Sequence, residues 1–271
     1  MGIASEIAFH HEAFRLSVDS GVENAARDQL AQYESENGTP VKSTPAPKLH
    51  EAAWIAPALY AVSMVSIAFL AGRDLFSFDW YATGALSSSI QSTHQWWRAV
   101  TALTLHADHD HLLRNLGFGA FFYYAAARLM GPGIAFAGAF FAAIVGNVLD
   151  SVLMPRTHVS IGASTIVFAT LGLISAYSWR IQFSKRMQWA HRWAPLVIGV
   201  ALLGFLGSGG ENTDVLAHLT GFASGVVAAV MLANVPMGIF DSKAVQAASA
   251  VAPLLLLSAA WTWAAASLPH T

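Results

Sequence analysis

Residues 161–179 read IGASTIVFATLGLISAYSW, and residues 214–234 read DVLAHLTGFASGVVAAVMLAN. Each stretch is long and apolar enough to cross a bilayer as a helix, and one further apolar stretch separates them along the chain. They therefore enter the membrane from the same side, with Ser164 and His218 each about 5 Å below the entry point. Because an ionisable side chain inside hydrocarbon is costly, His218 indicates a functional site, with Ser164 as its partner.

The composition is typical of a membrane protein. Hydrophobic residues make up 55% of the 271 residues and charged residues 11%, against about 25% charged in an average soluble domain. The 14 Lys and Arg nearly match the 16 Asp and Glu, so the charge gives no reason to expect nucleic acid as a partner. The chain has no cysteine, which excludes disulfides, thiolate metal sites and a cysteine nucleophile.

Seven apolar segments are long enough to serve as membrane spans. They lie at about 54–72, 111–130, 133–150, 161–179, 193–209, 214–234 and 246–267, and none needs a charge at its centre. The sequence therefore predicts an all-α membrane protein that crosses the bilayer seven times.

The basic residues predict the orientation of these spans, because cytoplasmic loops are enriched in Lys and Arg. With a cytoplasmic N-terminus, eight basic residues from the linker onward fall on the inner side and four on the outer side. The inner set is Lys42, Lys48, Arg128, Arg180, Lys185, Arg186, Arg192 and Lys243, and the outer set is Arg73, Arg98, Arg114 and Arg156. We therefore expect Ser164 and His218 near the outer face, together with His111 and Asn115.

Residues 1–49 form a separate region ahead of the first span. Residues 14–18 alternate in hydrophobicity like a short strand, and residues 22–37 carry apolar side chains at helical spacing. The stretch 38–48 contains three prolines and is typical of a linker. A region of this size is too small to bury a core alone.

A long outer loop, about 73–110, is rich in aromatic residues, which are Phe76, Phe78, Trp80, Tyr81, Trp96 and Trp97. Aromatic side chains collect at membrane–water interfaces, so this loop is expected to lie in the interfacial region. For Trp80 and Tyr81 we expect plain interfacial anchoring. Trp261 and Trp263, near the outer end of the last span, predict the same role.

Four motifs follow one another along the chain. They are Trp97-Arg98, the run from His106 to Asn115, Gly162-Ala163-Ser164 with Gly172 eight residues on, and Ala217-His218-Leu219-Thr220-Gly221 with Gly225. In this order, within about residues 54–234, they resemble the rhomboid intramembrane serine proteases. The resemblance implies an all-helical core of six spans, to which the seventh apolar segment is an addition.

The resemblance implies that Ser164 is the nucleophile and His218 its general base, without a third, acidic member. It also implies that the Ser164 backbone N–H, His111 and Asn115 stabilise the oxyanion. The chemistry of these residues agrees, because His111 and Asn115 share one helix face and both donate hydrogen bonds. Ser164 lies in the first turn of its helix, where free N–H groups favour an anion. Asp214, one turn before His218, is expected to cap that helix.

Gly221 and Gly225 form a GxxxG pattern on the His218 helix. Such a pattern lets a neighbouring backbone approach closely. We expect this approach to bring the imidazole of His218 within hydrogen-bond reach of Ser164.

Two positions depart from the family's pattern. Thr165 stands where the family has glycine, so a branched side chain enters a tightly packed region next to the oxyanion site. Phe168 stands where a tyrosine is usual, and it can still stack on His218 but has no hydroxyl. The alternative to an active protease is a catalytically inactive relative that acts as a membrane binding or quality-control protein.

The run His106-Ala107-Asp108-His109-Asp110-His111 is rich in potential metal ligands. A metal-dependent membrane protein is therefore a further alternative, although the run lacks the HExxH arrangement of zinc peptidases. The resemblance already assigns His111 to the oxyanion and His106 to loop structure. We expect neither a metal nor another cofactor.

These observations predict three parts: a cytosolic region and linker at 1–49, a rhomboid protease core at 50–240 and an additional transmembrane helix at 241–271. The resemblance implies an intramembrane serine endopeptidase that cuts single-span membrane proteins near the outer face, after a small residue. We expect a multi-pass protein of a bacterial cytoplasmic (inner) membrane with a cytoplasmic N-terminus. Its partners would be transmembrane substrates and the lipid bilayer, with no nucleic acid.

Overall fold

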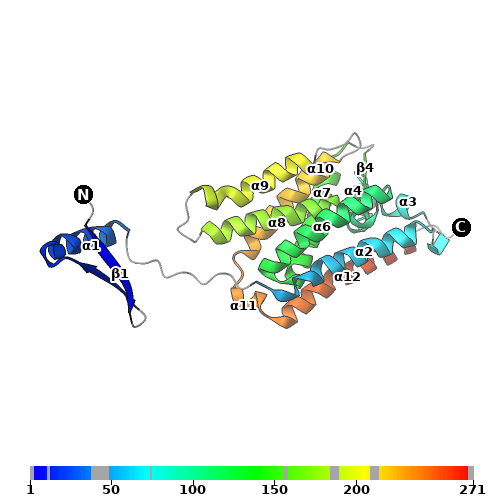
Figure 1. Ribbon diagram of the computed structural model, residues 1–271. Coiled ribbons are helices and arrows are strands. Elements are labelled where there is room, and N and C mark those ends of the chain that lie inside the picture. The colour runs from blue at the N-terminus through cyan, green and yellow to red at the C-terminus, as the bar shows by residue number, and fades with distance from the viewer. Residues whose placement is uncertain are drawn as a thin grey trace. The chain divides into compact units, whose positions relative to one another are not determined.

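The computed structural model describes residues 3–10, 13–37, 49–73, 75–77, 79–155, 158–183, 189–207 and 214–267 (Figure 1). The chain divides into two compact units, Met1–Ala46 and Pro47–Thr271. The linker expected at 38–48 lies outside the described residues. So do Phe78 and five basic residues that enter the orientation count, which are Lys42, Lys48, Arg156, Lys185 and Arg186.

The N-terminal unit is a β-hairpin followed by a helix. Its elements are β1 (Ser5–His10), β2 (Ala13–Val18), the 3-10 turn η1 (Ser20–Val22) and α1 (Glu23–Asn37). The strand expected at 14–18 and the helix expected at 22–37 are both present, and β1 is an addition to them. β1 forms because antiparallel pairing with β2 satisfies backbone groups that a lone strand would leave unpaired.

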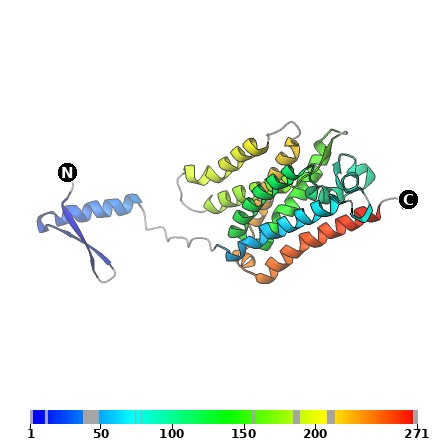
Figure 2. The same cartoon turned by 45° about the vertical axis from the view of Figure 1, so that its right-hand side comes forward.

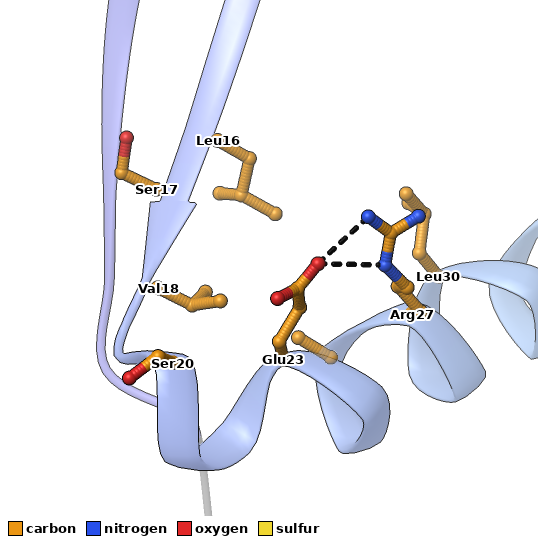
Figure 3. Close-up of a pocket in the computed structure, with 8 residues that line it drawn as sticks. Leu16, Ser17, Val18, Ser20, Glu23, Arg27 and Leu30 are labelled. Carbon is orange, nitrogen blue, oxygen red and sulfur yellow. Dashed lines mark hydrogen bonds and ion pairs between the residues drawn. The ribbon is translucent and has the colours of Figure 1, made fainter.

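A groove lies between β2 and α1, with Leu16 and Val18 on one side and Leu30 on the other (Figure 3). Glu23 Oε1 accepts two hydrogen bonds from Arg27, at 2.7 and 3.1 Å, in an exposed ion pair that contributes little stability. Every side chain that the structure describes in this unit is exposed or half-buried, which agrees with the small size of the unit. The groove is lined by none of the expected site residues.

Over the described part of the second unit, seven long helices form a bundle (Figures 1 and 2). They are α2 (Ile55–Ala71), α6 (His109–Met130), α7 (Pro132–Leu153), α8 (Ser164–Phe183), α9 (Trp189–Gly207), α10 (Val215–Leu232) and α12 (Lys243–Ala266). The short elements are η2 (Glu51–Trp54), η3 (Leu75–Ser77), α3 (Trp80–Gly84), β3 (Leu86–Ser87), α4 (Ile90–Thr93), α5 (Arg98–Thr101), η4 (Ala102–Thr104), β4 (Val159–Ser160) and α11 (Met237–Phe240).

Each of the seven expected apolar segments overlaps one of these long helices, although several helices extend a few residues beyond the expected bounds. Within the described residues, four helical stretches are long and apolar enough to cross a membrane, which are Glu51–Ala71, Pro132–Leu153, Val215–Leu232 and Lys243–Ala266. α9 contains a shorter apolar stretch, Trp193–Gly207. The first two turns of α6 are rich in polar residues, among them His111, Arg114 and Asn115. The protein is thus predominantly helical, with several helices suited to a bilayer.

α8 is the central helix of the bundle and contacts α6, α7, α9 and α10. A β-carbon at Gly225 of α10 would overlap the carbonyl O of Ala169 in α8, and one at Gly172 of α8 would overlap that of Phe222 in α10. Glycine therefore lets the two backbones touch, as small residues do between membrane helices. The close approach predicted by the GxxxG spacing of α10 is confirmed.

The described residues of the 73–110 loop form short elements at the end of the bundle where α6, α8 and α10 begin, which we call the Ser164 end (Figure 1). Its strand β3 pairs with β4, so that Leu86 lies opposite Ser160, shortly before Ser164. Trp80 is 4% exposed and its ring centroid lies 4.7 Å from that of Trp261. Interfacial anchoring is therefore wrong for Trp80 and Trp261, because each indole has a protein partner inside the fold.

Candidate functional site

Ser164 is the first residue of α8, and the two residues before it are held by hydrogen bonds. Gly162 N–H donates to the carbonyl O of Ala102 at 2.9 Å, and Ala163 N–H donates to His106 Nε2 at 3.4 Å. Gly162 has a φ of +132°, a conformation that side chains rarely adopt. This turn places Ser164, which is half-buried, at the positive end of the α8 dipole.

His111 lies directly against this turn. A β-carbon at Gly162 would be 2.8 Å from His111 Cε1 and 3.6 Å from Ser164 Oγ, so glycine leaves the space between the two side chains. His111 projects from the first turn of α6, whose N-cap residue Asp108 accepts the His111 N–H at 2.7 Å. The fold thus brings His111 and Ser164 to one place from distant parts of the chain.

Asn115 lies one turn further along α6 and is 7% exposed. Its Nδ2 has no hydrogen-bond partner among the described residues, and such a buried unpaired donor calls for an explanation in a folded protein. The backbone carbonyl of Asn115 accepts the Tyr60 hydroxyl from α2 at 2.9 Å, which fixes this turn of α6. A donor without a partner, on the helix face of His111, is suited to binding a developing oxyanion.

His218 in α10 is 7% exposed, and two contacts hold its ring. Nδ1 lies 2.9 Å from the carbonyl O of Gly207, at the end of α9. Because a carbonyl can only accept, Nδ1 carries the proton in the neutral ring and Nε2 has the free lone pair. The ring also packs on Phe168, with centroids 4.3 Å apart. This tautomer is the one that a general base at Nε2 requires.

The contact with Phe168 places His218 beside the face of α8 that carries Ser164. Phe168 follows Ser164 by four residues and so lies on the same helix face. His111 lies against the turn before Ser164 and His218 packs on Phe168, so residues of α6 and α10 both lie beside the first turns of α8. Among the described residues, the His218 ring forms its hydrogen bond with the carbonyl O of Gly207 and not with Ser164.

Asp214 caps α10, as its position one turn before His218 predicts. Its Oδ1 accepts the Ala217 N–H at 3.0 Å, and its Oδ2 lies 3.0 Å from His158 Nε2. Burial alone would raise the pKa of Asp214, but hydrogen bonds from Ser160, Ala217 and His158 lower this pKa below its usual value. The carboxylate is therefore ionised at neutral pH and engaged with the helix terminus and His158.

Thr165 is buried where α7, α8 and α10 meet. A β-carbon at Gly146 of α7 would lie 3.2 Å from Thr165 Cγ2, and one at Gly221 of α10 would lie 3.0 Å from it. Glycines on both neighbouring helices therefore leave room for the branched side chain. The methyl group of Thr165 packs between helices, away from the turn that precedes Ser164.

The run 106–111 forms no metal site in the part of the chain that the structure describes. Three of its members have other partners: His106 accepts the Ala163 amide, Asp108 caps α6, and His111 faces Gly162. The metal alternative therefore has no geometric support. The run instead builds the surroundings of Ser164.

His106 is suited to accepting a hydrogen bond because its ring is neutral. Burial and the neighbouring His111 lower the pKa of His106 to about 4, and they outweigh the Thr104 carbonyl and Asp108, which act in the opposite direction. At neutral pH the ring is therefore uncharged, and Nε2 accepts the Ala163 amide with the lone pair that protonation would remove.

Sequence reasoning missed two groups that orient the site residues, the carbonyl of Gly207 and the hydroxyl of Tyr60. A backbone carbonyl has no sequence signal of its own, although Gly207 ends a helix, where glycine is common. Tyr60 places a hydroxyl inside an apolar span, and a buried hydroxyl needs a hydrogen-bond partner, so the sequence did contain a signal for it.

Two comparisons with known proteins identify one family. A family model described as Rhomboid domain matches residues 93–235, more than half of the chain. YdcA of Bacillus subtilis (strain 168), named as a rhomboid protease, is 30% identical over an alignment of 137 residues that covers 48% of this chain and 64% of YdcA.

Two further relatives also have protease names. Rhomboid-like protease 3 of Toxoplasma gondii is 33% identical over 143 residues, covering 53% of this chain and 54% of that protein. Rhomboid protease GluP of Bacillus subtilis (strain 168) is 30% identical over 173 residues, covering 63% of this chain and 33% of GluP. The chain thus aligns with less than two thirds of the length of each of these relatives.

Proposed function

The chain belongs to the rhomboid family, and from this membership and the site around Ser164 we propose that it is an intramembrane serine endopeptidase. The observation that supports the proposal most strongly is the position and tautomer of the His218 ring. The ring packs on Phe168, one helical turn after Ser164, and its Nδ1 is bound to the Gly207 carbonyl, so Nε2 is the basic nitrogen. A serine and a neutral imidazole in this relation are suited to nucleophilic catalysis.

In the proposed reaction, Ser164 Oγ attacks the carbonyl carbon of the scissile peptide bond while His218 Nε2 accepts the hydroxyl proton. The Ser164 N–H, His111 and Asn115 Nδ2 donate to the oxyanion of the tetrahedral intermediate. His218 then protonates the leaving amine, and water hydrolyses the acyl-enzyme by the same steps in reverse. Hydrogen bonds between catalytic residues are often long in a free enzyme and shorten when substrate binds, so the hydrogen bond between Ser164 and His218 is expected to form with substrate in place.

The proposed substrate is a single-span membrane protein with a small residue before the cut. Its helix must unwind near the outer face, because a backbone inside hydrocarbon otherwise keeps its carbonyls hydrogen-bonded within the helix. The proposed topology has seven spans and a cytoplasmic N-terminus in a bacterial inner membrane. Within it, 1–49 is the cytosolic region, 50–240 the protease core and 241–271 the additional helix, and no cofactor takes part.

The packing of Thr165 favours activity over the alternative of a catalytically inactive binding protein. An inactive relative would be expected if the side chain at 165 displaced the turn before Ser164. Thr165 Cγ2 instead lies beside Gly146 and Gly221, which leave it space.

Cleavage by the purified chain in liposomes, with a single-span protein substrate, tests the proposal. The wild type should cut the substrate and react with a fluorophosphonate, and cleavage should survive chelation of divalent cations. Ser164→Ala should neither cut the substrate nor react with the fluorophosphonate. It should keep the thermal stability of the wild type, because it removes only one hydroxyl. Ser66→Ala, at an exposed serine of α2, is the matched control and should behave as the wild type. Undiminished cleavage by Ser164→Ala would refute the assignment.

A further inference from the structure

Two consecutive amides ahead of Ser164 are bound by one short segment of the 73–110 loop. Ala102 accepts the Gly162 N–H through its carbonyl O, and His106 accepts the Ala163 N–H through its ring. We call residues 102–106 the 102–106 turn. Because it binds both amides, this turn determines where α8 begins. The next backbone donor along the chain is the Ser164 N–H, which is the one proposed to bind the oxyanion.

Thr104, in the middle of the 102–106 turn, is held from α12. Trp261 Nε1 donates to Thr104 Oγ1 at 3.2 Å, and the Thr104 hydroxyl donates in turn to the carbonyl O of Thr101 at 2.8 Å. Thr104 is 0% exposed and Trp261 is 7% exposed. The hydrogen bonds therefore lie inside the protein, where they are shielded from competition with water.

The indole of Trp261 occupies a fitted position in the fold. A β-carbon at Gly84 would lie 2.5 Å from the Trp261 ring, so the absence of a side chain there admits the indole. Trp80 packs on another part of the same ring, with centroids 4.7 Å apart. Figures 1 and 2 show the C-terminal end of α12 beside the short helices of the Ser164 end, and α12 contacts α3 and α5 there.

We propose that Trp261 is a positioning residue for the protease reaction, acting through Thr104 on the backbone that carries Ser164. The inference rests on the proposed function. α12 lies outside residues 93–235, which the family model matches, and it is the proposed addition to the six-span core, so here an additional helix contributes to the active-site geometry. The physical reason is that catalysis requires reacting groups to be held within a fraction of an ångström, and a displacement of about 1 Å costs up to about 100-fold in rate.

Single substitutions that remove the hydrogen bond test the proposal. Trp261→Phe keeps an aromatic ring but removes the N–H, and Thr104→Val keeps the shape but removes the acceptor. Each should lower kcat by about three- to tenfold, the range expected for one buried hydrogen bond, while KM for the substrate stays unchanged. Thr104→Ser retains the hydroxyl and should restore turnover to near the wild-type rate.

The double variant and a matched control separate positioning from general loss of stability. Trp261→Phe with Thr104→Val should turn over no more slowly than the slower single variant, because both remove the same interaction. Trp263→Phe is the control: Trp263 lies two residues on in α12, is half exposed and contacts Trp97 through its ring. This variant should keep the wild-type kcat. Thermal stability of every variant is measured in the same detergent.

The outcomes distinguish this inference from the proposed function. If the wild type neither cleaves substrate nor reacts with a fluorophosphonate, the proposed function fails and this inference fails with it. If the wild type cleaves and Trp261→Phe and Thr104→Val match its kcat, the proposed function stands and the positioning role of Trp261 is refuted. Multiplicative losses in the double variant would also refute it, because Trp261 and Thr104 would then act separately.

Discussion

His218 and the oxyanion donors are expected to differ in how much activity their loss removes. His218→Ala removes the base that activates the serine, so cleavage should fall below detection. His111→Ala and Asn115→Ala each remove one of several donors and should slow turnover by about 100- to 1,000-fold. The measurement is turnover of the three variants on one substrate, with thermal stability checked in detergent.

Wild-type turnover in both His111→Ala and Asn115→Ala would show that α6 does not line the active site. Tyr60→Phe is an informative companion, because the Tyr60 hydroxyl binds the backbone carbonyl of Asn115 and not its side chain. It should therefore have a smaller effect than Asn115→Ala.

Thr165 tests whether the departure from the family's glycine affects catalysis or packing. Thr165→Gly leaves a space between α7, α8 and α10 and puts glycine in a helix, so it should lower the free energy of unfolding by about 1–3 kcal/mol. Turnover by the folded fraction should be kept or raised, because the side chain points between helices. Thr165→Val, which keeps the branched shape, is the control. If the wild type is inactive and the Thr165→Gly variant is active, the result would support the alternative that this chain is a catalytically inactive relative.

Among the elements, the contact between α8 and α10 is expected to be the least tolerant. Gly225→Ala places a methyl group where Ala169 O now lies, so it should force the helices apart and destabilise the protein by about 1–3 kcal/mol. Activity should fall with it, because Ser164 and His218 are on these two helices. Thermal unfolding and turnover are the measurements.

Gly117→Ala on α6 is the matched control for Gly225→Ala. Apart from the adjoining backbone of α6, no atom of the described residues lies within 4 Å of a β-carbon at Gly117, so alanine should be neutral or stabilising by up to about 1 kcal/mol. Equal stability of the two variants would mean that α8 and α10 are not in backbone contact.

The 73–110 loop shows why an aromatic-rich segment is difficult to interpret from sequence. Trp80, Trp97 and Trp261 suit a membrane interface by composition, and all three are buried in the protein. Trp97 donates to the carbonyl O of Thr83 at 3.2 Å, and Trp261 donates to Thr104. An indole N–H requires a partner in either setting, so the residue type alone does not decide between them.

For the whole molecule, the neutral His106 predicts a loss of stability in acid. Its pKa is about 4 in the folded protein, below the ordinary value of 6.5, so the unfolded chain binds the proton first as pH falls. The contribution of His106 to stability is complete above pH 6.5 and is lost as pH falls from 6.5 towards 4. The melting temperature in detergent should therefore decline more steeply over this range in the wild type than in His106→Gln.

His109→Gln is the control for this pH series. It makes the same substitution at an exposed histidine three residues after His106. It should follow the wild type. Identical slopes for His106→Gln and the wild type would contradict the buried, neutral state of His106.

The sequence by itself determined the helical class, the positions of the long helices and the family. Apolar runs of membrane-spanning length are local signals, and the order of motifs from Trp97 to Gly225 is a property of the chain alone. The close approach of the His218 helix to its neighbour was also predictable, because glycine spacing requires no knowledge of the partner. The roles of Ser164, His218, His111 and Asn115 remain predictions.

The tertiary structure alone decided which atoms meet. The partner of His218 Nδ1 is a backbone carbonyl at Gly207, and every residue has such a carbonyl, so no sequence pattern marks it. The bond from Trp261 to Thr104 joins segments far apart in the chain, and the indole enters because Gly84 has no side chain. Local sequence predicts periodicity and helix ends, whereas contacts between distant segments depend on how the helices pack.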